Sequence, residues 1–200
     1  MRLLAALPDF ALAIAALLTW IDPSILGEEW AGYFLTLMLL EFIVVHSAAF
    51  LGSVAFSDAP RRHRVKLTLG LAGFYTLFGA AIAFGAKAWW PLLAFWGLIV
   101  NRLLGILFGT VPSGHEREAM QASWVVGALS YLVGAFATVL LPLPELGVRR
   151  EMLGPIGDDS GGLWVDEPHR VMAFAFLYFT LAGLYALFAG RQASPAPLHS

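Results

Sequence analysis

The chain has 200 residues, of which 59% carry hydrophobic side chains and 13% are charged, and its formal net charge is −2. Soluble domains contain about 25% charged residues, and a soluble fold of this length has too little interior to bury so much apolar surface, so the composition predicts an integral membrane protein. The absence of cysteine excludes disulfides and thiolate metal sites, and the small net charge gives no attraction for nucleic acid.

Six apolar stretches are long enough to cross the hydrocarbon core of a bilayer, which takes about 20 helical residues. We therefore expect an all-α, polytopic bundle of six transmembrane helices with short loops, forming a single domain over residues 1–190. The helices are expected at about 3–21, 30–56, 65–86, 89–109, 121–141 and 169–189.

The first apolar stretch lies at the N-terminus, where a signal peptide would also have an apolar run. Asp9 interrupts its apolar run, and no small-residue cleavage motif follows Trp20. These features favour a retained helix. Five spans remain the alternative if this stretch behaves differently.

Between residues 67 and 109 the apolar run is almost unbroken, and as one helix it would be roughly 64 Å long. It therefore predicts two spans with a turn near Lys87 and Pro91. The connection 142–168 is the longest, and we interpret it as a plain connector rather than a lid. Residues 191–200 are expected to form a disordered tail.

Basic residues in the connections indicate the orientation, because cytoplasmic loops carry an excess of lysine and arginine. With six spans, seven basic residues fall on the side of the termini and four on the other side. The block Arg61, Arg62, Arg64 and Lys66 decides this difference, and it would also attract anionic lipid headgroups. We expect both termini in the cytoplasm. The few lysines and many alanines, glycines and leucines suggest a bacterial protein of the inner membrane.

Five polar residues fall inside the expected spans, where each is a candidate functional residue because burying it in hydrocarbon is costly. They are Asp9, Glu41, His46, Asn101 and Arg102. Counting from the middle of each span places all five within roughly 5 Å of the bilayer midplane or on its inner side. They form the candidate binding site or ion pathway.

Helical periodicity indicates which of these residues can meet. Glu41 and Arg102 both lie on faces rich in small residues, and Arg102 shares its face with the Gly105–Gly109 pair. This pattern predicts that the second and fourth helices pack together with Arg102 reaching Glu41, or alternatively Asp9. His46 points about 140° away from Glu41. It could bond Asn101, Ser47 or a backbone carbonyl.

The first functional hypothesis is transport of a small solute or ion. This transport could be coupled to the movement of protons. Glu41 and His46 would titrate, and Arg102 would act as the counter-ion or anion-binding group. A carrier of this size without an internal repeat would need to form a homo-oligomer. The opposing interpretation is that the polar cluster only fixes helix register.

Three other hypotheses stay open. The chain could be a non-catalytic subunit, assembly factor or sensor that binds other helices of a membrane complex. It could be an intramembrane enzyme acting on a lipid, although it contains no HExxH, DxxxD or GxSxG pattern. Haem bound between two histidines is disfavoured, because His46 and His169 differ by roughly 15 Å in depth. We expect no metal or cofactor.

Overall fold

The computed structural model describes residues 2–55, 57, 59–108 and 114–188. In chain order they form α1 (Arg2–Ile21), the 3₁₀ turn η1 (Pro23–Ile25), α2 (Trp30–Ala55), α3 (Arg61–Gly85), α4 (Trp90–Phe108), α5 (Gly114–Leu140), the 3₁₀ turn η2 (Arg150–Leu153), α6 (Pro155–Asp159), α7 (Leu163–Asp166) and α8 (Pro168–Phe188).

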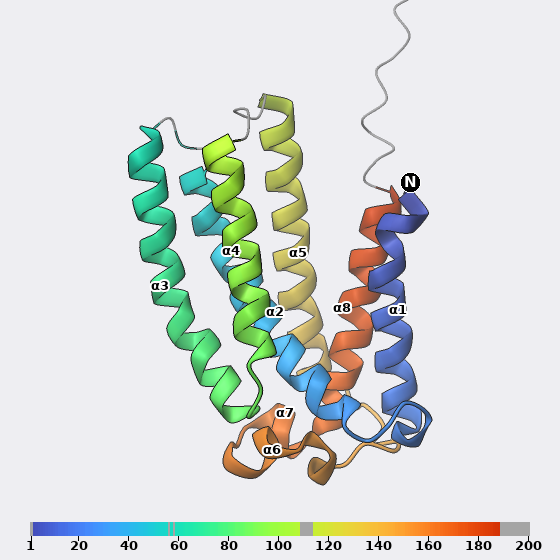
Figure 1. Ribbon diagram of the computed structural model, residues 1–200. Coiled ribbons are helices and arrows are strands. Elements are labelled where there is room, and N and C mark those ends of the chain that lie inside the picture. Colours follow the sequence, from blue (N-terminus) through green and yellow to red (C-terminus); the bar gives the residue numbers. More distant parts are fainter. Residues whose placement is uncertain (1, 56, 58, 109–113, 189–200) are drawn as a thin grey trace, which may run out of the picture.

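Within the described residues, six helices are long and apolar enough to cross a membrane. They are α1 to α5 and α8, and they stand roughly side by side (Figure 1). The predicted all-α bundle of six transmembrane helices is therefore confirmed, and the chain is an integral membrane protein. We call the end at which α1 begins and α8 ends the termini end, and the opposite end the cap end.

α3 begins earlier than predicted, at Arg61 rather than at 65, directly after Pro60. The apolar span predicted from 121 is part of a longer helix, because α5 starts at Gly114, as the Ser113–Glu116 capping pattern of the sequence indicates. In both helices backbone hydrogen bonding continues beyond the apolar run into polar turns that water can solvate. The basic block consequently forms the first turns of α3. The predicted tail 191–200 lies outside the described residues.

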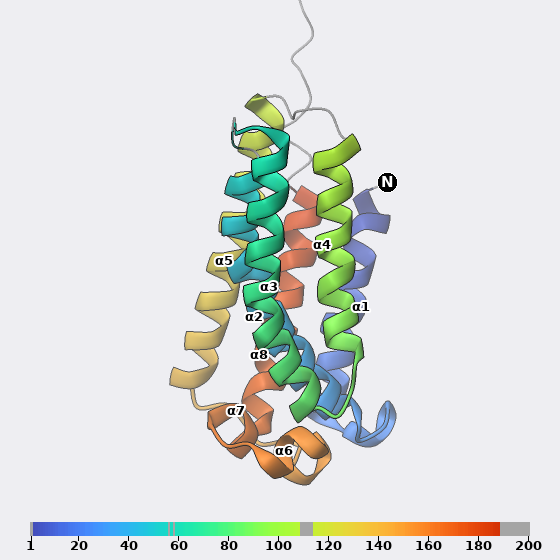
Figure 2. The same ribbon diagram turned by 60° about the vertical axis from the view of Figure 1, so that its left-hand side comes forward.

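Small residues allow α1 and α8 to pack against each other, and the two helices run side by side in both ribbon views (Figures 1 and 2). Ala6, Ala13 and Ala16 are buried on α1. On α8, a Cβ atom at Gly183 would lie only 3.0 Å from the ring of Phe10. The glycine therefore permits the close approach of the two helices.

α2 joins two hydrophobic clusters. Its first half packs with α1, α5 and α8 around Phe34, Met38 and Phe174, all of which are at most 1% exposed. Its second half packs with the α3–α4 hairpin around Phe95 and Ile99. α2 is thus the helix through which both halves of the bundle are connected.

The connection between α5 and α8 is folded, unlike the plain connector that we expected. We call residues 142–167 the cap. Four apolar side chains of the cap are buried against the bundle, one just before η2 and one in each of η2, α6 and α7: Val148, Leu153, Ile156 and Val165. The Arg150 guanidinium donates to Asp166 at 2.6 Å and to the carbonyls of Gly157 and Ser160 at 3.1 Å. These contacts close the cap on itself.

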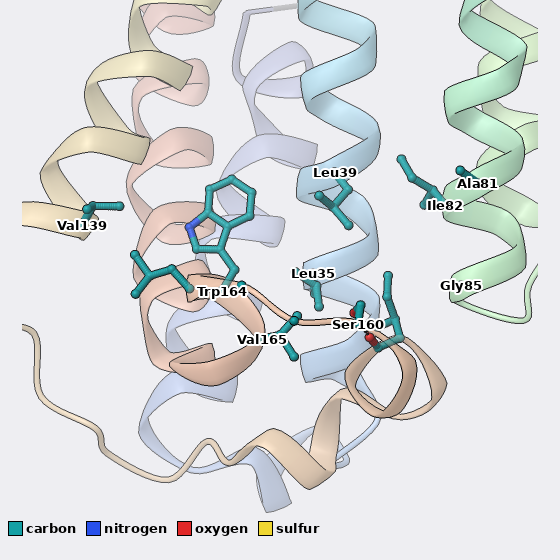
Figure 3. A pocket seen from close by; sticks show the side chains of 13 residues that line it. Leu35, Leu39, Ala81, Ile82, Gly85, Val139, Ser160, Trp164 and Val165 are labelled. Atoms are coloured by element: carbon teal, nitrogen blue, oxygen red, sulfur yellow. Dashed lines mark hydrogen bonds between the residues drawn. The ribbon is translucent and has the colours of Figure 1, made fainter.

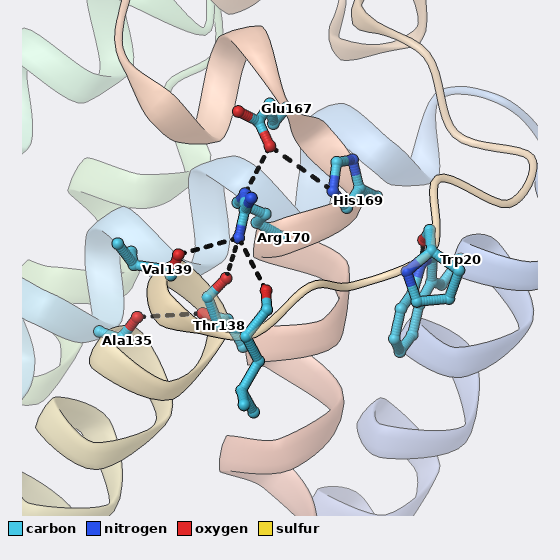
Figure 4. Close-up of polar contacts among 9 residues, drawn as sticks. Trp20, Ala135, Thr138, Val139, Glu167, His169 and Arg170 are labelled. Carbon is cyan, nitrogen blue, oxygen red and sulfur yellow. Dashed lines mark hydrogen bonds and ion pairs between the residues drawn. The ribbon is translucent and has the colours of Figure 1, made fainter.

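The start of α8 also holds the end of α5 (Figure 4). Arg170 Nη1 donates to the carbonyls of Thr138, Val139 and Leu141 at 2.6, 3.1 and 3.2 Å, and Arg170 Nε donates to Glu167 at 2.5 Å. The last carbonyls of a helix have no partner within it and carry partial negative charge, so a guanidinium there stabilises the helix end. Arg170 is accounted for by this structural role.

Candidate functional site

Glu41 lies near the middle of α2, and its partner is a tyrosine from another helix. Tyr178, near the middle of α8, donates a hydrogen bond from its hydroxyl to Glu41 Oε2 at 3.1 Å. Tyr131 of α5 packs edge-on against Tyr178, with ring centroids 5.6 Å apart, and donates to the carbonyl of Met38 at 2.9 Å. The carboxylate is therefore held at the junction of three helices.

Asp9 belongs to the same region of the bundle. It lies partly buried on α1 and interacts electrostatically with both Glu41 and Tyr178. Two of the five predicted polar residues are thus brought together. We call Asp9, Glu41, Tyr131 and Tyr178 the Glu41 cluster.

A crevice of about 310 Å³ lies beside Glu41, between α2 and α5 with Tyr178 at one wall. The α2 residues that line it recur every three or four positions, as do those on α5, so each helix presents one face to it. The lining consists of Glu41, Val44, Val45, Ala48, Met120, Ser123, Trp124, Gly127 and Tyr178.

The direction of the crevice follows from these positions. Glu41 and Tyr178 are at mid-span, whereas Met120 and Trp124 lie in the half of α5 nearer the termini end, and both are exposed. Trp124 Nε1 donates to the carbonyl of Val45 at 2.9 Å, which holds the two walls together. On the cap side the buried core around Phe34 and Phe174 fills the space. The crevice therefore runs from mid-span toward the termini end.

Arg102 does not pair with Glu41 or Asp9. α2 and α4 do pack together, as predicted, but a Cβ atom at Gly52 would lie 3.7 Å from Arg102 Nη1. Gly52 is about 16 Å from Glu41 along α2. Nη1 is buried and has no hydrogen-bond partner within the part of the chain that the structure describes. The expected Glu41–Arg102 ion pair is therefore absent from the described residues.

His46 also lies apart from the Glu41 cluster. Its ring stacks on Phe42, with centroids 5.7 Å apart, and its Nδ1 is 3.0 Å from the hydroxyl of Tyr75 on α3. The predicted rotation away from Glu41 is confirmed, whereas none of the expected partners is used. Ser47 donates to the carbonyl of Val44 at 3.2 Å, so it does not form a nucleophile–base pair with His46.

The remaining candidate residues from the sequence lie outside the Glu41 cluster. Asn101 is exposed on α4. In the basic block Arg61, Arg62 and Lys66 are exposed, and Arg64 is partly buried. Among the described residues, no group of three or more His, Asp or Glu side chains is placed to hold a metal ion.

The sequence contains a signal for part of the site, because polar side chains at mid-span of several helices can outline a small hydrated cavity. Tyr131 and Tyr178 lie at mid-span, and the α5 spacing Met120, Trp124, Gly127 and Tyr131 repeats every three or four residues. That spacing marks one helix face, but it does not tell which neighbouring helix the face meets. No protein-family model, curated protein or solved structure matches the chain.

Proposed function

We propose that this membrane protein transports a small cation or a proton-coupled solute through the crevice, with Glu41 as the group that binds the cation or proton. One observation carries the proposal: a mid-span carboxylate lies on the wall of a crevice, and within the described residues its polar partner is a tyrosine hydroxyl rather than a cation. Ion-pathway carboxylates in membrane proteins are placed in this way.

Charge supports a cation rather than an anion as the transported species. Asp9 adds a second carboxyl group near Glu41, while Arg102, the nearest expected counter-ion, lies beside Gly52. A carboxylate at this depth is costly unless its charge is compensated. Binding of a proton or a small cation supplies that compensation, and Tyr178 can donate its hydrogen bond to the carboxyl group in either state.

The arrangement of helices supplies a route for alternating access. α1 and α8 form one closely packed pair, and Arg170 and Glu167 fix the start of α8 to the end of α5 at the cap end. A tilt of the pair about this fixed end would open or close the crevice at the termini end. Carriers usually alternate between their two states by moving one structural repeat against another. Because the sequence shows no internal repeat, we propose that two copies of the chain form the working carrier.

Exposed basic residues indicate which end of the bundle faces the cytoplasm. The basic residues Arg61, Arg62 and Lys66 lie exposed at the termini end of α3. Because basic residues remain on the cytoplasmic side, we place the termini and the mouth of the crevice there. We propose the bacterial inner membrane as the location, with anionic lipid headgroups around the basic block.

Proton movement in liposomes tests the function. The purified chain would be reconstituted around a pH-sensitive dye, and pulses of Na⁺ or K⁺ would be applied with the membrane potential clamped. We expect a cation-driven change in internal pH that Glu41→Gln abolishes. Glu29→Gln, the same change at an exposed position just before α2, is the control and should leave the flux unchanged. Equal flux in both variants would contradict the role of Glu41.

Asn101 supports a second candidate function, a subunit of a larger membrane complex. Its amide is exposed near the middle of α4, and an amide facing hydrocarbon without a partner costs a few kcal/mol. A polar group on a neighbouring helix would remove this cost. Cross-linking from Asn101→Cys in native membranes tests the hypothesis: a cross-linked species supports a helix partner at this surface, and its absence opposes one.

A further inference from the structure

A second cavity, unrelated to the Glu41 crevice, lies at the cap end between α2, α3, the last turn of α5 and the cap (Figure 3). Its volume of about 570 Å³ falls within the range of about 300–1,000 Å³ typical of sites for small organic ligands. Leu35 and Leu39 form one wall, Ile82 another, and Trp164 and Val165 line the side next to the cap. Among the side chains that the structure describes, no ionisable one lines it.

The cavity extends over the depth of one membrane leaflet. α2 begins at Trp30, and Leu39 lies about 14 Å further along the helix. Half of the hydrocarbon core is about 15 Å thick. The cavity therefore reaches from the interface at the cap end to about the bilayer midplane.

A polar rim, formed by the cap segment Ser160–Gly162, lies at the interface. The Arg150 guanidinium is bound to the carbonyl of Ser160, is ion-paired with Asp166 at 2.6 Å and is 45% exposed, so this ion pair lies beside the rim. Cβ atoms at Gly161 and Gly162 would have nothing within 4 Å, so the rim is open. Gly162 has φ +121°, a conformation that side chains strain, so glycine is needed here.

We propose that this cavity binds one acyl chain of a phospholipid from the leaflet on the cap side, with the ester region of the lipid at the Ser160–Gly162 rim. The apolar lining formed by the described side chains suits hydrocarbon, the depth suits a chain from one leaflet, and the open rim lets the ester region remain at the interface. A polar solute would find no partner in the deep part. A helix of about 10 Å diameter would not fit between α2 and α3. This site is independent of the proposed transport.

Trp164 gives the site its own optical signal, because bromine atoms on an acyl chain quench a nearby indole. The full-length chain in detergent would be titrated with a phospholipid brominated at mid-chain. The fluorescence of Trp164 is obtained by subtracting the fluorescence of Trp164→Phe from that of the native chain. We expect quenching of this signal to saturate near one lipid per protein.

Ala81→Phe fills the cavity from α3, whereas Ala94→Phe makes the same change on the exposed face of α4, away from the cavity. We expect Ala81→Phe to weaken binding at least about tenfold and Ala94→Phe to leave it unchanged. Val139→Phe, from the opposite wall, is the second variant if Ala81→Phe does not fold. Quenching that rises without saturation, or that is equal in the filled and control variants, would overturn the proposal.

Discussion

The hydroxyl of Tyr178 donates a hydrogen bond to the carboxylate of Glu41, 137 positions earlier in the chain, and so links the middle of α8 to the middle of α2. The bond ties the α1–α8 pair to the helix on which both halves of the bundle pack. The same contact is therefore part of the fold and of the proposed transport site.

Removing this hydrogen bond should weaken the link between α8 and α2. We expect Tyr178→Phe and Glu41→Gln to be coupled by about 0.5–1.5 kcal/mol in a double-mutant cycle of unfolding in detergent. Tyr33→Phe, at a half-exposed position on α2, is the control and should show no coupling to Glu41→Gln. Additive effects of Tyr178→Phe and Glu41→Gln would mean that the bond contributes nothing to stability.

Replacing Arg170 should loosen the end of α5. Arg170→Met keeps most of the side-chain length but leaves three carbonyls and Glu167 without their donor, and we expect a loss of about 2–4 kcal/mol. Thermal unfolding in detergent measures the change. Arg149→Met, the same change at an exposed arginine of the cap, should shift the midpoint little. A comparable shift in both variants would contradict the capping role of Arg170.

Gly32 should be intolerant of a side chain. A Cβ atom at this position would lie 2.6 Å from the carbonyl oxygen of Leu153, so Gly32→Ala must push the cap away from α2 at a cost of about 1–3 kcal/mol. Gly73→Ala meets nothing within 4 Å and should be neutral or slightly stabilising. Limited proteolysis of the cap distinguishes the two variants. Equal resistance of the cap to the protease in both variants would contradict a tight contact between Gly32 and Leu153.

His46 should be dispensable for flux, although it lies close to Glu41 in the sequence. Its ring faces Phe42 and Tyr75 rather than the crevice. His46→Phe should therefore leave the cation-driven pH change in liposomes intact. Loss of flux with normal folding would restore the original hypothesis that His46 and Glu41 titrate together.

The sequence predicted the helices and the direction of side chains on one helix well, for a physical reason. A membrane span must be a continuous apolar run, so its existence is visible in the sequence. The helical period is fixed, so Glu41 and His46, which are five residues apart, had to face different neighbours. The structure gives them Tyr178 and Tyr75.

Contacts between helices were harder to predict. Counting depth along the helix axis placed Glu41 within reach of the long Arg102 side chain, but that side chain lies beside Gly52, farther along α2. Arg170 was missed as a capping residue because its acceptors are backbone carbonyls, which leave no mark in the sequence. The cap was missed because an irregular segment has no period to recognise.

Access of water to the crevice tests the central claim most directly, and the absence of native cysteine makes the measurement simple. Gly127 lines the crevice at mid-span and has room for a side chain, whereas Leu129, two residues further along α5, is 55% exposed on the outer surface of the bundle. A cationic, membrane-impermeant thiol reagent applied from the side of the termini should modify Gly127→Cys but not Leu129→Cys. The reaction of Gly127→Cys should slow when Glu41→Gln is added. An unreactive Gly127→Cys in a folded protein would contradict a hydrated path to Glu41.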